Sequence, residues 1–190
     1  MKEQQAKEQR IVNGVNVTQL FETIDAINGQ TDIAKFNFRA TNKWINGANN
    51  RTTVDDFYGA CETHTRETPF VFEKDEPPVL LGNDKGANPV EYLFAALAGC
   101  VTTGLVYHAA AKGIELDEVE STYEGDLDLR GFLGISDEVR NGYEGITISF
   151  KIKSDAPREQ IEELVQIAQD RSPVFDIVSN PGPVKVVLAG

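Results

Sequence analysis

The chain has 190 residues and a formal net charge of −12, with 18 Lys and Arg against 30 Asp and Glu. Its length fits one domain with an appendage, and 41% apolar with 25% charged residues is a globular composition that excludes disorder as the main state. An acidic chain repels phosphate backbones and anionic lipid headgroups, so we expect it to bind neither nucleic acid nor a membrane surface.

The first residues and the cysteine count indicate the compartment. Residues 1–10, MKEQQAKEQR, contain no apolar stretch, so we expect no secretory signal peptide and a cytoplasmic location. Two cysteines, Cys61 and Cys100, are too few for a disulfide scaffold and are more typical of free or redox-active thiols.

A helical extension is predicted to precede the main domain. Asn16 and Gln19 make a capping-box pattern, apolar residues then recur at helical spacing, and Gly29 ends the run, which predicts a helix over residues 16–28. One such helix cannot fold alone. We therefore expect residues 1–35 to form an N-terminal extension and residues 36–190 to form the main domain.

An antiparallel meander is predicted next. Residues 36–39 alternate between apolar and polar side chains, and Asn46-Gly47 is a turn signal. Further strands are expected over residues 52–64 and 70–74, and a loop rich in proline and glycine follows them.

The next predicted element is a long apolar helix. Asn88 is its expected N-cap, Pro89 takes the first helical position, and Gly113 ends it. Residues 89–111 are long enough to cross a bilayer, but Glu91 and His108 would be costly there, so we expect a core helix of a soluble domain.

The remaining pattern indicates the fold class. An amphipathic helix is expected from Pro157, and strands are predicted over residues 116–129, 146–152 and 183–188. Clusters of strands separated by two long helices favour an α+β fold over a doubly wound parallel sheet.

Cys100 is the residue that points most directly to chemistry. It lies about midway along the predicted long helix, between small residues that leave space beside its sulfur. Many buried cysteines are only small core hydrophobes, whereas a redox nucleophile needs a stabilised thiolate and some access to solvent. The residue pattern alone favours the small core hydrophobe over the redox nucleophile.

The residues around Cys100 resemble a known family. The segment from Asn88 to Cys100, NPVEYLFAALAGC, is similar to the central helix of the OsmC/Ohr family, that is, osmotically inducible protein C and the organic hydroperoxide resistance proteins. Further matches are EGDLD at 124–128, followed by Gly131, and RSPV at 171–174. The resemblance extends over most of the chain, from Phe36 to Leu188.

The resemblance implies an OsmC-like fold, with antiparallel sheets around a long buried central helix and two active sites at the interface of an intertwined homodimer. It also implies a thiol-dependent peroxidase that prefers organic hydroperoxides. In such enzymes the helix cysteine becomes a sulfenic acid that a second cysteine resolves, while an arginine and a glutamate hold the thiolate. A guanidinium suits this role because it stabilises a thiolate and can bond the leaving oxygen.

The sequence departs from the family pattern at the resolving position. Ser172 stands where the second cysteine is expected, and a serine cannot form a disulfide. Three alternatives follow: Cys61 substitutes as the resolving thiol, an external thiol reduces the sulfenic acid, or the peroxidase activity is absent. For Cys61 to resolve Cys100, their Cα atoms must come within about 4.4–6.8 Å.

The sequence also departs from the pattern at the glutamate. The family's glutamate lies ten positions before the cysteine, where this chain has Val90, and Glu91 is one position later. Nine steps along a straight helix place Glu91 roughly 180° around the axis from Cys100. Asn88 and Glu91 also fit a capping box, so Glu91 is a candidate both for catalysis and for helix capping.

Arg51 is the candidate cationic partner of the thiolate. It follows the Asn46-Gly47 turn at the start of a predicted strand, in a region similar to the family's arginine-bearing hairpin. Arg39, on the preceding strand, is the competing candidate, and either could be an ordinary surface arginine.

No metal or cofactor is expected. Cys61 and His64 form a Cys-x-x-His pair, but on a regular strand residues three apart point to opposite faces. With Cys100 and His108 they would supply four ligand types that zinc accepts, yet the spacing of Cys100 and His108 is not that of a common zinc half-site.

Two functions remain at this point. The first is a peroxidase in oxidative-stress defence, with Cys100 as peroxidatic thiolate, Arg51 and Glu91 as its partners, an organic hydroperoxide as substrate and an external thiol as reductant. The second is an OsmC-fold binding protein that holds a small apolar ligand without turnover, because Ser172 replaces the resolving cysteine. The family setting of Cys100 favours the first.

Overall fold

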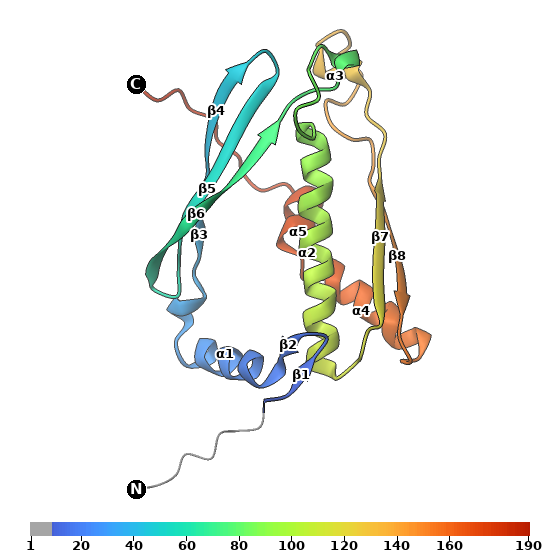
Figure 1. Ribbon diagram of the computed structural model, residues 1–190. Coiled ribbons are helices and arrows are strands. Elements are labelled where there is room, and N and C mark those ends of the chain that lie inside the picture. The colour runs from blue at the N-terminus through green and yellow to red at the C-terminus, as the bar shows by residue number, and fades with distance from the viewer. Residues whose placement is uncertain (1–8) are drawn as a thin grey trace, which may run out of the picture. The chain divides into compact units, whose positions relative to one another are not determined.

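The protein is described by a computed structural model over residues 9–190 (Figure 1). Its contacts divide the chain into two compact units. Unit 1 comprises the described residues up to Ile11 together with Asn16–Ala95, and unit 2 comprises Val12–Val15 and Ala96–Gly190. The expected boundary between residues 1–35 and 36–190 stays a prediction.

The elements follow one another as short strands, helices and hairpins in both units. In chain order they are β1 (Ile11–Val12), β2 (Val15–Asn16), α1 (Val17–Gly29), a 3₁₀ turn (Thr31–Ala34), β3 (Asn37–Phe38), β4 (Thr41–Asn46), β5 (Asn49–Gly59), β6 (Glu62–Lys74), a second 3₁₀ turn (Pro78–Leu80), α2 (Pro89–Lys112), β7 (Glu118–Glu124), α3 (Leu129–Phe132), β8 (Thr147–Lys153), α4 (Arg158–Asp170) and α5 (Pro173–Ser179).

The predicted α+β class is confirmed. In unit 1, β5 pairs antiparallel with β3, β4 and β6, and in unit 2, β7 pairs antiparallel with β8. Helices precede and follow these sheets instead of alternating strand by strand, which is the arrangement of an α+β fold.

Helix α1 begins as its capping pattern predicts. The Asn16 side chain accepts a hydrogen bond from the Gln19 amide at 3.0 Å. A hairpin that the sequence analysis did not foresee comes before it: Asn13 and Gly14 both have positive φ and join β1 to β2. Asn-Gly is the strongest short hairpin signal, so this turn was available in the sequence.

The sheet of unit 1 has β5 at its centre. Residues 52–64 were expected to form one strand, and this is wrong, because β5 ends at Gly59 and the chain turns at Ala60 and Cys61. Both turn residues have positive φ, at 50° and 67°, as a tight two-residue hairpin requires. Neither is Gly, Asn or Asp, so no residue type marked the turn.

Strand β6 is longer than predicted. It runs through residues 65–69, which the sequence analysis left between two strands, and its pairing with β5 shifts register between Val54 and Asp56. Pro69 lies in this irregular stretch, where a proline is tolerated because a bulged strand has no regular ladder bond to lose.

A buried carboxylate organises the loop between β6 and α2. Asp75, 1% exposed, accepts hydrogen bonds from the backbone amides of Glu76, Asn83 and Lys85. Burial alone would raise the pKa of Asp75, but these amide donors outweigh it and the net shift is downward. The loop packs tightly on β6: a Cβ built on Gly86 would lie 2.2 Å from the Glu73 carbonyl oxygen.

Helix α2 has the predicted ends. Asn88 and Glu91 exchange side-chain to backbone hydrogen bonds, and Gly113, with φ 73°, ends the helix. By length and composition α2 is the one helix among the described residues that could cross a membrane, a test that the core helix of a soluble protein also passes. In this single chain 28% of its most apolar window is buried.

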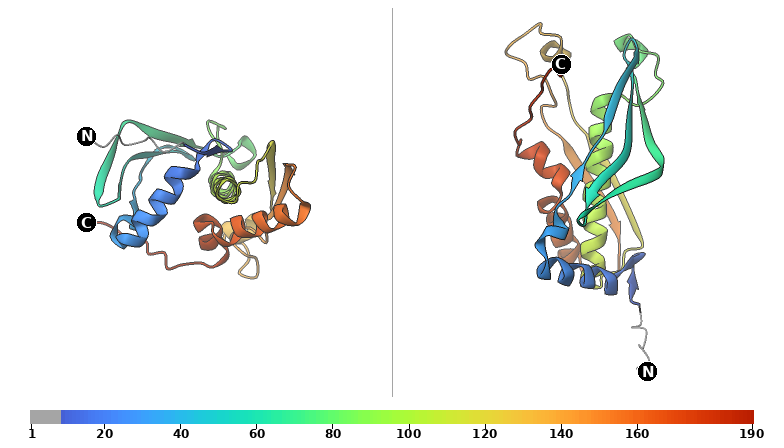
Figure 2. Two further views of the ribbon diagram at one scale, coloured as in Figure 1. Left: turned by 90° about the horizontal axis from the view of Figure 1, so that it is seen from below. Right: turned by 90° about the vertical axis from the view of Figure 1, so that its left-hand side faces the viewer.

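The core of unit 2 forms around α2. Val101 and Leu105 pack with Ala168 of α4, and partly buried side chains of β7, β8 and α5 cover this cluster. The ribbon shows α4 and the β7–β8 hairpin beside α2 (Figure 2). A second cluster joins Ala109 to Leu164 of α4 and Ile114. The apolar face predicted for the helix after Pro157 is therefore confirmed by the burial of Leu164 and Ala168.

The C-terminal part differs from the prediction in two places. Helix α5 was not expected, although Ser172 and Pro173 are the residue types of an N-cap and a first helical position. The strand expected over residues 183–188 is wrong for the single chain: these residues belong to no strand, and Val184, Val186 and Leu188 are at least 84% exposed. The strand expected over residues 116–129 ends at Glu124, and α3 follows.

The core of unit 2 can be tested at Leu105, which is 0% exposed. We expect Leu105→Ala to lower the free energy of unfolding by about 2–5 kcal/mol, because it removes buried methyl groups and leaves a cavity among neighbours that cannot fully close. Leu81→Ala, at a position 92% exposed, is the matched control and should change stability little. Urea unfolding followed by circular dichroism measures both. Equal losses for the two variants would contradict the assigned core.

Candidate functional site

Cys100 lies on α2 in unit 2 and is partly buried. Its neighbour Val101 points into the core with Leu105 and Ala168. Apart from Gly99, its chain neighbours and the backbone of its own helix, no described atom lies within 4 Å of a Cβ built on Gly99, so the helix surface next to the cysteine has room. The thiol therefore sits at the margin of the core, where a reactive cysteine can still be reached.

Arg51 lies on β5 in unit 1, where it is paired with a carboxylate. Its Nε donates to Glu73 Oε2 at 2.7 Å, and Asn49 Nδ2 donates to Glu73 Oε1 at 2.9 Å. The Glu73 hydrogen bond raises the pKa of Arg51, and the bonds from Arg51 and Asn49 lower the pKa of Glu73. Glu73 was not among the predicted site residues.

The sheet register fixes the face on which this pair lies. Arg51 is opposite Glu73, and the next pair along the strands is Thr52 opposite Phe72. Because neighbouring residues of a strand point to opposite faces, Arg51 and Glu73 lie on the face away from Phe72. The Phe72 ring meets the Tyr92 ring of α2 edge to face at 6.1 Å. Arg51 thus faces away from the side on which the first turn of α2 packs.

Arg39, the competing arginine, has a different partner. Its guanidinium pairs with Asp56 at 3.0 Å. Both arginines of unit 1 that the sequence analysis considered are therefore bound to carboxylates of the same sheet, and neither is an isolated surface cation.

Glu91 acts as a helix cap. Its Oε2 accepts from the Asn88 amide at 2.8 Å, and Asn88 Oδ1 accepts from the Glu91 amide at 3.0 Å. Two backbone donors at the start of α2 are satisfied reciprocally, which is the capping role proposed from the spacing. Among Arg51, Glu91 and Cys61, the predicted site residues of unit 1, no hydrogen bond or ion pair joins any two described side chains.

Cys61 is exposed at the tip of the β5–β6 hairpin. His64 lies along β6, stacks on the Phe57 ring at 4.8 Å and places Nε2 3.1 Å from the Gly59 carbonyl oxygen. The stacking extends through Phe57 to Phe38 and Phe36. Among the described residues no three His, Cys, Asp or Glu side chains form a group that could hold a metal ion.

Ser172, predicted to stand where a resolving cysteine was expected, is a buried helix cap. It is 3% exposed, and its Oγ accepts from the Phe175 amide at 3.1 Å. Phe175 belongs to the side chains that pack on the Val101 and Leu105 cluster. The hydroxyl therefore has a structural role next to the same core that borders Cys100.

In the carboxylate-rich segment after β7, Asp128 is engaged in local hydrogen bonds. Asp128 caps α3 and binds Arg130 through its side chain and backbone. The hydrogen bond from the Arg130 side chain is the main cause that lowers the pKa of Asp128 to about 2. A carboxylate so firmly ionised and paired is not a general acid or base near neutral pH.

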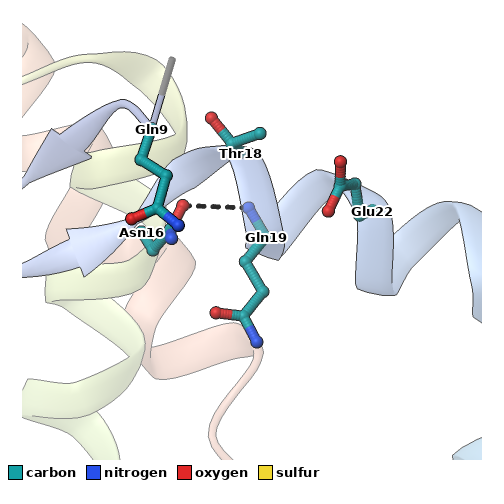
Figure 3. Close-up of a pocket in the computed structure, with 5 residues that line it drawn as sticks. All are labelled: Gln9, Asn16, Thr18, Gln19 and Glu22. Carbon is teal, nitrogen blue, oxygen red and sulfur yellow. Dashed lines mark hydrogen bonds between the residues drawn. The ribbon is translucent and has the colours of Figure 1, made fainter. Parts of the chain in front are cut away.

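A polar pocket lies at the N-terminus of α1, remote in sequence from the predicted site residues. It is lined by Gln9, Asn16, Thr18, Gln19 and Glu22, and Figure 3 shows the bond from the Gln19 amide to Asn16 within it. Its lining holds no cysteine, histidine or cation. The pocket is the capped start of a helix, and none of the predicted site residues lines it.

Glu73 is the candidate residue that the sequence analysis missed. The pairing of Lys43 with Arg51 across β4 and β5 was not accessible from the sequence either. A regular two-residue turn at Asn46-Gly47 would set Lys43 opposite Asn50, whereas the turn falls at residues 47–48 and the register shifts between Trp44 and Asn46. The pairing of Arg51 with Glu73 depends on the turn at residues 60–61 and on the register shift in β6, which no residue pattern indicated.

Comparisons with known proteins agree with this fold. A family model described as OsmC-like protein matches residues 82–187, which is more than half of the chain. No curated protein matches the chain.

Two solved structures illustrate the likeness. An OsmC like protein from Mycoplasma pneumoniae is 16% identical, with a TM-score of 0.57 over 76% of this chain and 89% of that chain. A protein from Psychrobacter arcticus 273-4, whose name refers to osmotic stress and a detoxification response, is 14% identical, with a TM-score of 0.52 over 72% of this chain and 85% of that chain. At such identities the likeness concerns the fold.

Asp128 should make stability depend on pH. Its pKa of about 2 is below the value of about 4 for an unfolded aspartate, so the ionised group stabilises the fold above about pH 4 and loses this effect as the pH falls toward 2. We expect Asp128→Asn, which keeps an oxygen for the cap but loses the charge, to have a lower Tm than the wild type near pH 6. This difference in Tm between the variant and the wild type should disappear between about pH 4 and pH 2.

Circular dichroism melts across this pH range measure the effect. Asp137→Asn removes a charge from an exposed position in the loop after α3 and should leave the difference in Tm from the wild type small at every pH. If the Tm difference between Asp128→Asn and the wild type stays constant down to about pH 2, the assigned ion pair is contradicted.

Proposed function

This chain belongs to the OsmC-like protein family, and on that basis we propose that it is a thiol-dependent peroxidase that reduces organic hydroperoxides through Cys100. The observation that carries the proposal is the position of Cys100, partly buried on α2 at the end of the NPVEYLFAALAGC segment, with room beside it at Gly99. The name of the Psychrobacter arcticus protein supports a role in detoxification under stress.

In the proposed reaction the Cys100 thiolate attacks one oxygen of the hydroperoxide. An S–O bond forms, the O–O bond breaks, and the alcohol leaves after taking up a proton. Cysteine is oxidised to sulfenic acid while the peroxide is reduced by two electrons. A thiol then condenses with the sulfenic acid to give a mixed disulfide and water, and a second thiol releases Cys100.

The resolving thiol is proposed to come from outside the chain. Ser172 cannot form a disulfide, and its hydroxyl is engaged in capping α5. Cys61 is exposed on its hairpin tip and is the alternative resolving thiol. The experiment on Cys100 below separates these two routes.

Arg51 is proposed as the cation that holds the thiolate and the leaving oxygen. It carries its charge on a guanidinium with several donors, which suits both tasks. Its side chain is 49% exposed, so the guanidinium is accessible to a partner beyond Glu73. Glu91 has no catalytic role in this proposal, because its carboxylate is engaged at the start of α2.

We propose that the protein is a homodimer with its active sites at the interface. The α2 helix is mostly apolar but largely uncovered in the single chain, with Tyr107 50% exposed. Leaving so apolar a helix in water is unfavourable, and a second copy is the simplest cover. Arg51 also faces away from the side where its own α2 begins, which suits a site completed by a second chain.

The peroxidase proposal predicts rapid oxidation of Cys100. With one equivalent of cumene hydroperoxide and a sulfenic-acid trap, we expect intact mass spectrometry to find the adduct on Cys100, formed faster than with hydrogen peroxide. Cys100→Ser should abolish it. Cys61→Ser is the matched control and should keep it.

Two other outcomes have definite meanings. A disulfide between Cys61 and Cys100 in place of the adduct would identify Cys61 as the resolving thiol. Oxidation of Cys100 no faster than that of an ordinary free thiol would exclude the peroxidase and favour a protein that binds a small apolar ligand without turnover.

The dimer proposal is tested by mass in solution. Light scattering after size-exclusion chromatography should give twice the chain mass of 20.9 kDa. Tyr107→Glu places a charge on the uncovered surface of α2 and should shift the mass toward the monomer. Val79→Glu, at an exposed position outside α2, is the control. A monomer in the wild type would contradict the proposal.

A further inference from the structure

The clearest polar arrangement outside the predicted site residues is the carboxylate of Glu73. Both of its oxygens are engaged: Oε1 accepts from Asn49 and Oε2 accepts from Arg51. Asn49 is 3% exposed, and its Nδ2 is also 3.1 Å from the Lys74 carbonyl oxygen, so the residue that holds Glu73 is itself fixed. The chain of contacts therefore runs from a buried amide through a carboxylate to the guanidinium.

The backbone of Glu73 is also held. Its carbonyl oxygen accepts from the Tyr92 hydroxyl at 2.8 Å, and the loop packs against the same carbonyl at Gly86. Glu73 is 28% exposed at its side chain while Arg51 is 49% exposed. Glu73 is therefore the more rigid partner, and it sets the orientation of the Arg51 guanidinium.

The pair leaves the arginine able to bind something else. Only Nε of Arg51 bonds to Glu73, and its two Nη groups donate to no described residue of unit 1. Lys43 lies directly opposite Arg51 on β4, so two like charges are adjacent and Glu73 on the other side offsets them. A guanidinium held at Nε presents a planar pair of Nη groups to a ligand.

The Glu91 carboxylate, the predicted glutamate of the site, is engaged elsewhere. The position ten before Cys100 is Val90, and the Glu91 carboxylate accepts from the Asn88 amide at the start of α2. Among the described residues of unit 1, Glu73 is the carboxylate paired with Arg51.

We propose that Glu73 on β6 is the positioning residue for Arg51, in place of a glutamate on the helix. The inference rests on the proposed function, in which Arg51 holds the Cys100 thiolate. Glu73 does not touch the reacting atoms; it fixes the guanidinium so that its Nη groups are presented in one orientation. A misplacement of about 1 Å in such a group is enough to slow a reaction strongly.

The experiment compares five full-length variants, Arg51→Ala, Glu73→Ala, Glu73→Gln, Glu67→Ala and the double variant Arg51→Ala/Glu73→Ala. The first readout is the rate of Cys100 oxidation by cumene hydroperoxide. We expect Glu73→Ala to slow it by about tenfold or more, and the double variant to be no slower than Arg51→Ala, since Glu73 acts through Arg51. Glu67→Ala removes the same charge from an exposed position of β6 and should react like the wild type.

The second readout separates positioning from simple charge. The rate of Cys100 alkylation by iodoacetamide is followed against pH. If Glu73 only repelled the thiolate, its removal would shift the midpoint of this profile to lower pH. If Glu73 positions Arg51, its removal lets the cation move away and the midpoint shifts to higher pH. Glu73→Gln keeps the shape and one acceptor oxygen, so it should give an intermediate shift even if Glu73→Ala folds poorly.

Each failure has its own signature. Wild-type rates in both Glu73 variants, a midpoint that moves to lower pH, or additive losses in the double variant would overturn the role of Glu73. A wild-type rate in Arg51→Ala would also overturn the role of Glu73, but it would leave the proposed chemistry of Cys100 intact. If Cys100 in the wild type is no more reactive than a free thiol, the proposed function fails instead.

Discussion

The register of β5 is the constraint on which the arginine side of the site depends. β5 is bonded to β4 on one side and to β6 on the other, which places Lys43, Arg51 and Glu73 in one row across the sheet. A slip of one residue between β5 and β6 would put Arg51 and Glu73 on opposite faces, and a slip between β4 and β5 would do the same to Lys43 and Arg51. The pairing therefore brings three charged residues that are distant in sequence next to one another.

Glu91 and Ser172, where the sequence was expected to depart from the family pattern, have the same structural role. Glu91 and Ser172 both supply side-chain oxygens to backbone amides at the first turns of helices, α2 and α5. These amides have no partner within their own helix and lose stability if left unsatisfied. Each residue is thus explained by capping alone, and any catalytic use would have to be added to that role.

The sequence predicted the helices better than the strands. Helix ends carry chemical signals, and Asn16, Asn88, Pro89 and Gly113 were each interpreted correctly. The turn at Ala60 and Cys61 carried no such signal, because both residues adopt positive φ without being Gly, Asn or Asp. One missed turn was enough to hide Glu73, since the partner of Arg51 across β5 and β6 depends on it. Cys100, by contrast, was identified from its helix segment and needed no register.

The short hairpin at Asn13 links the first residues to a distant part of the chain. Its Nδ2 donates to the Ile114 carbonyl oxygen and its Oδ1 accepts from the Leu116 amide, both at 2.9 Å. The side chain thus satisfies two backbone groups in the segment that follows α2. Because Val12–Val15 belong to one unit and the residues on either side belong to the other, no single cut of the polypeptide separates the two units. Removing the residues up to Val15 would therefore leave the Ile114 carbonyl oxygen and the Leu116 amide of unit 2 without their Asn13 partner, so truncation at the N-terminus acts on a part of the chain about 100 residues away.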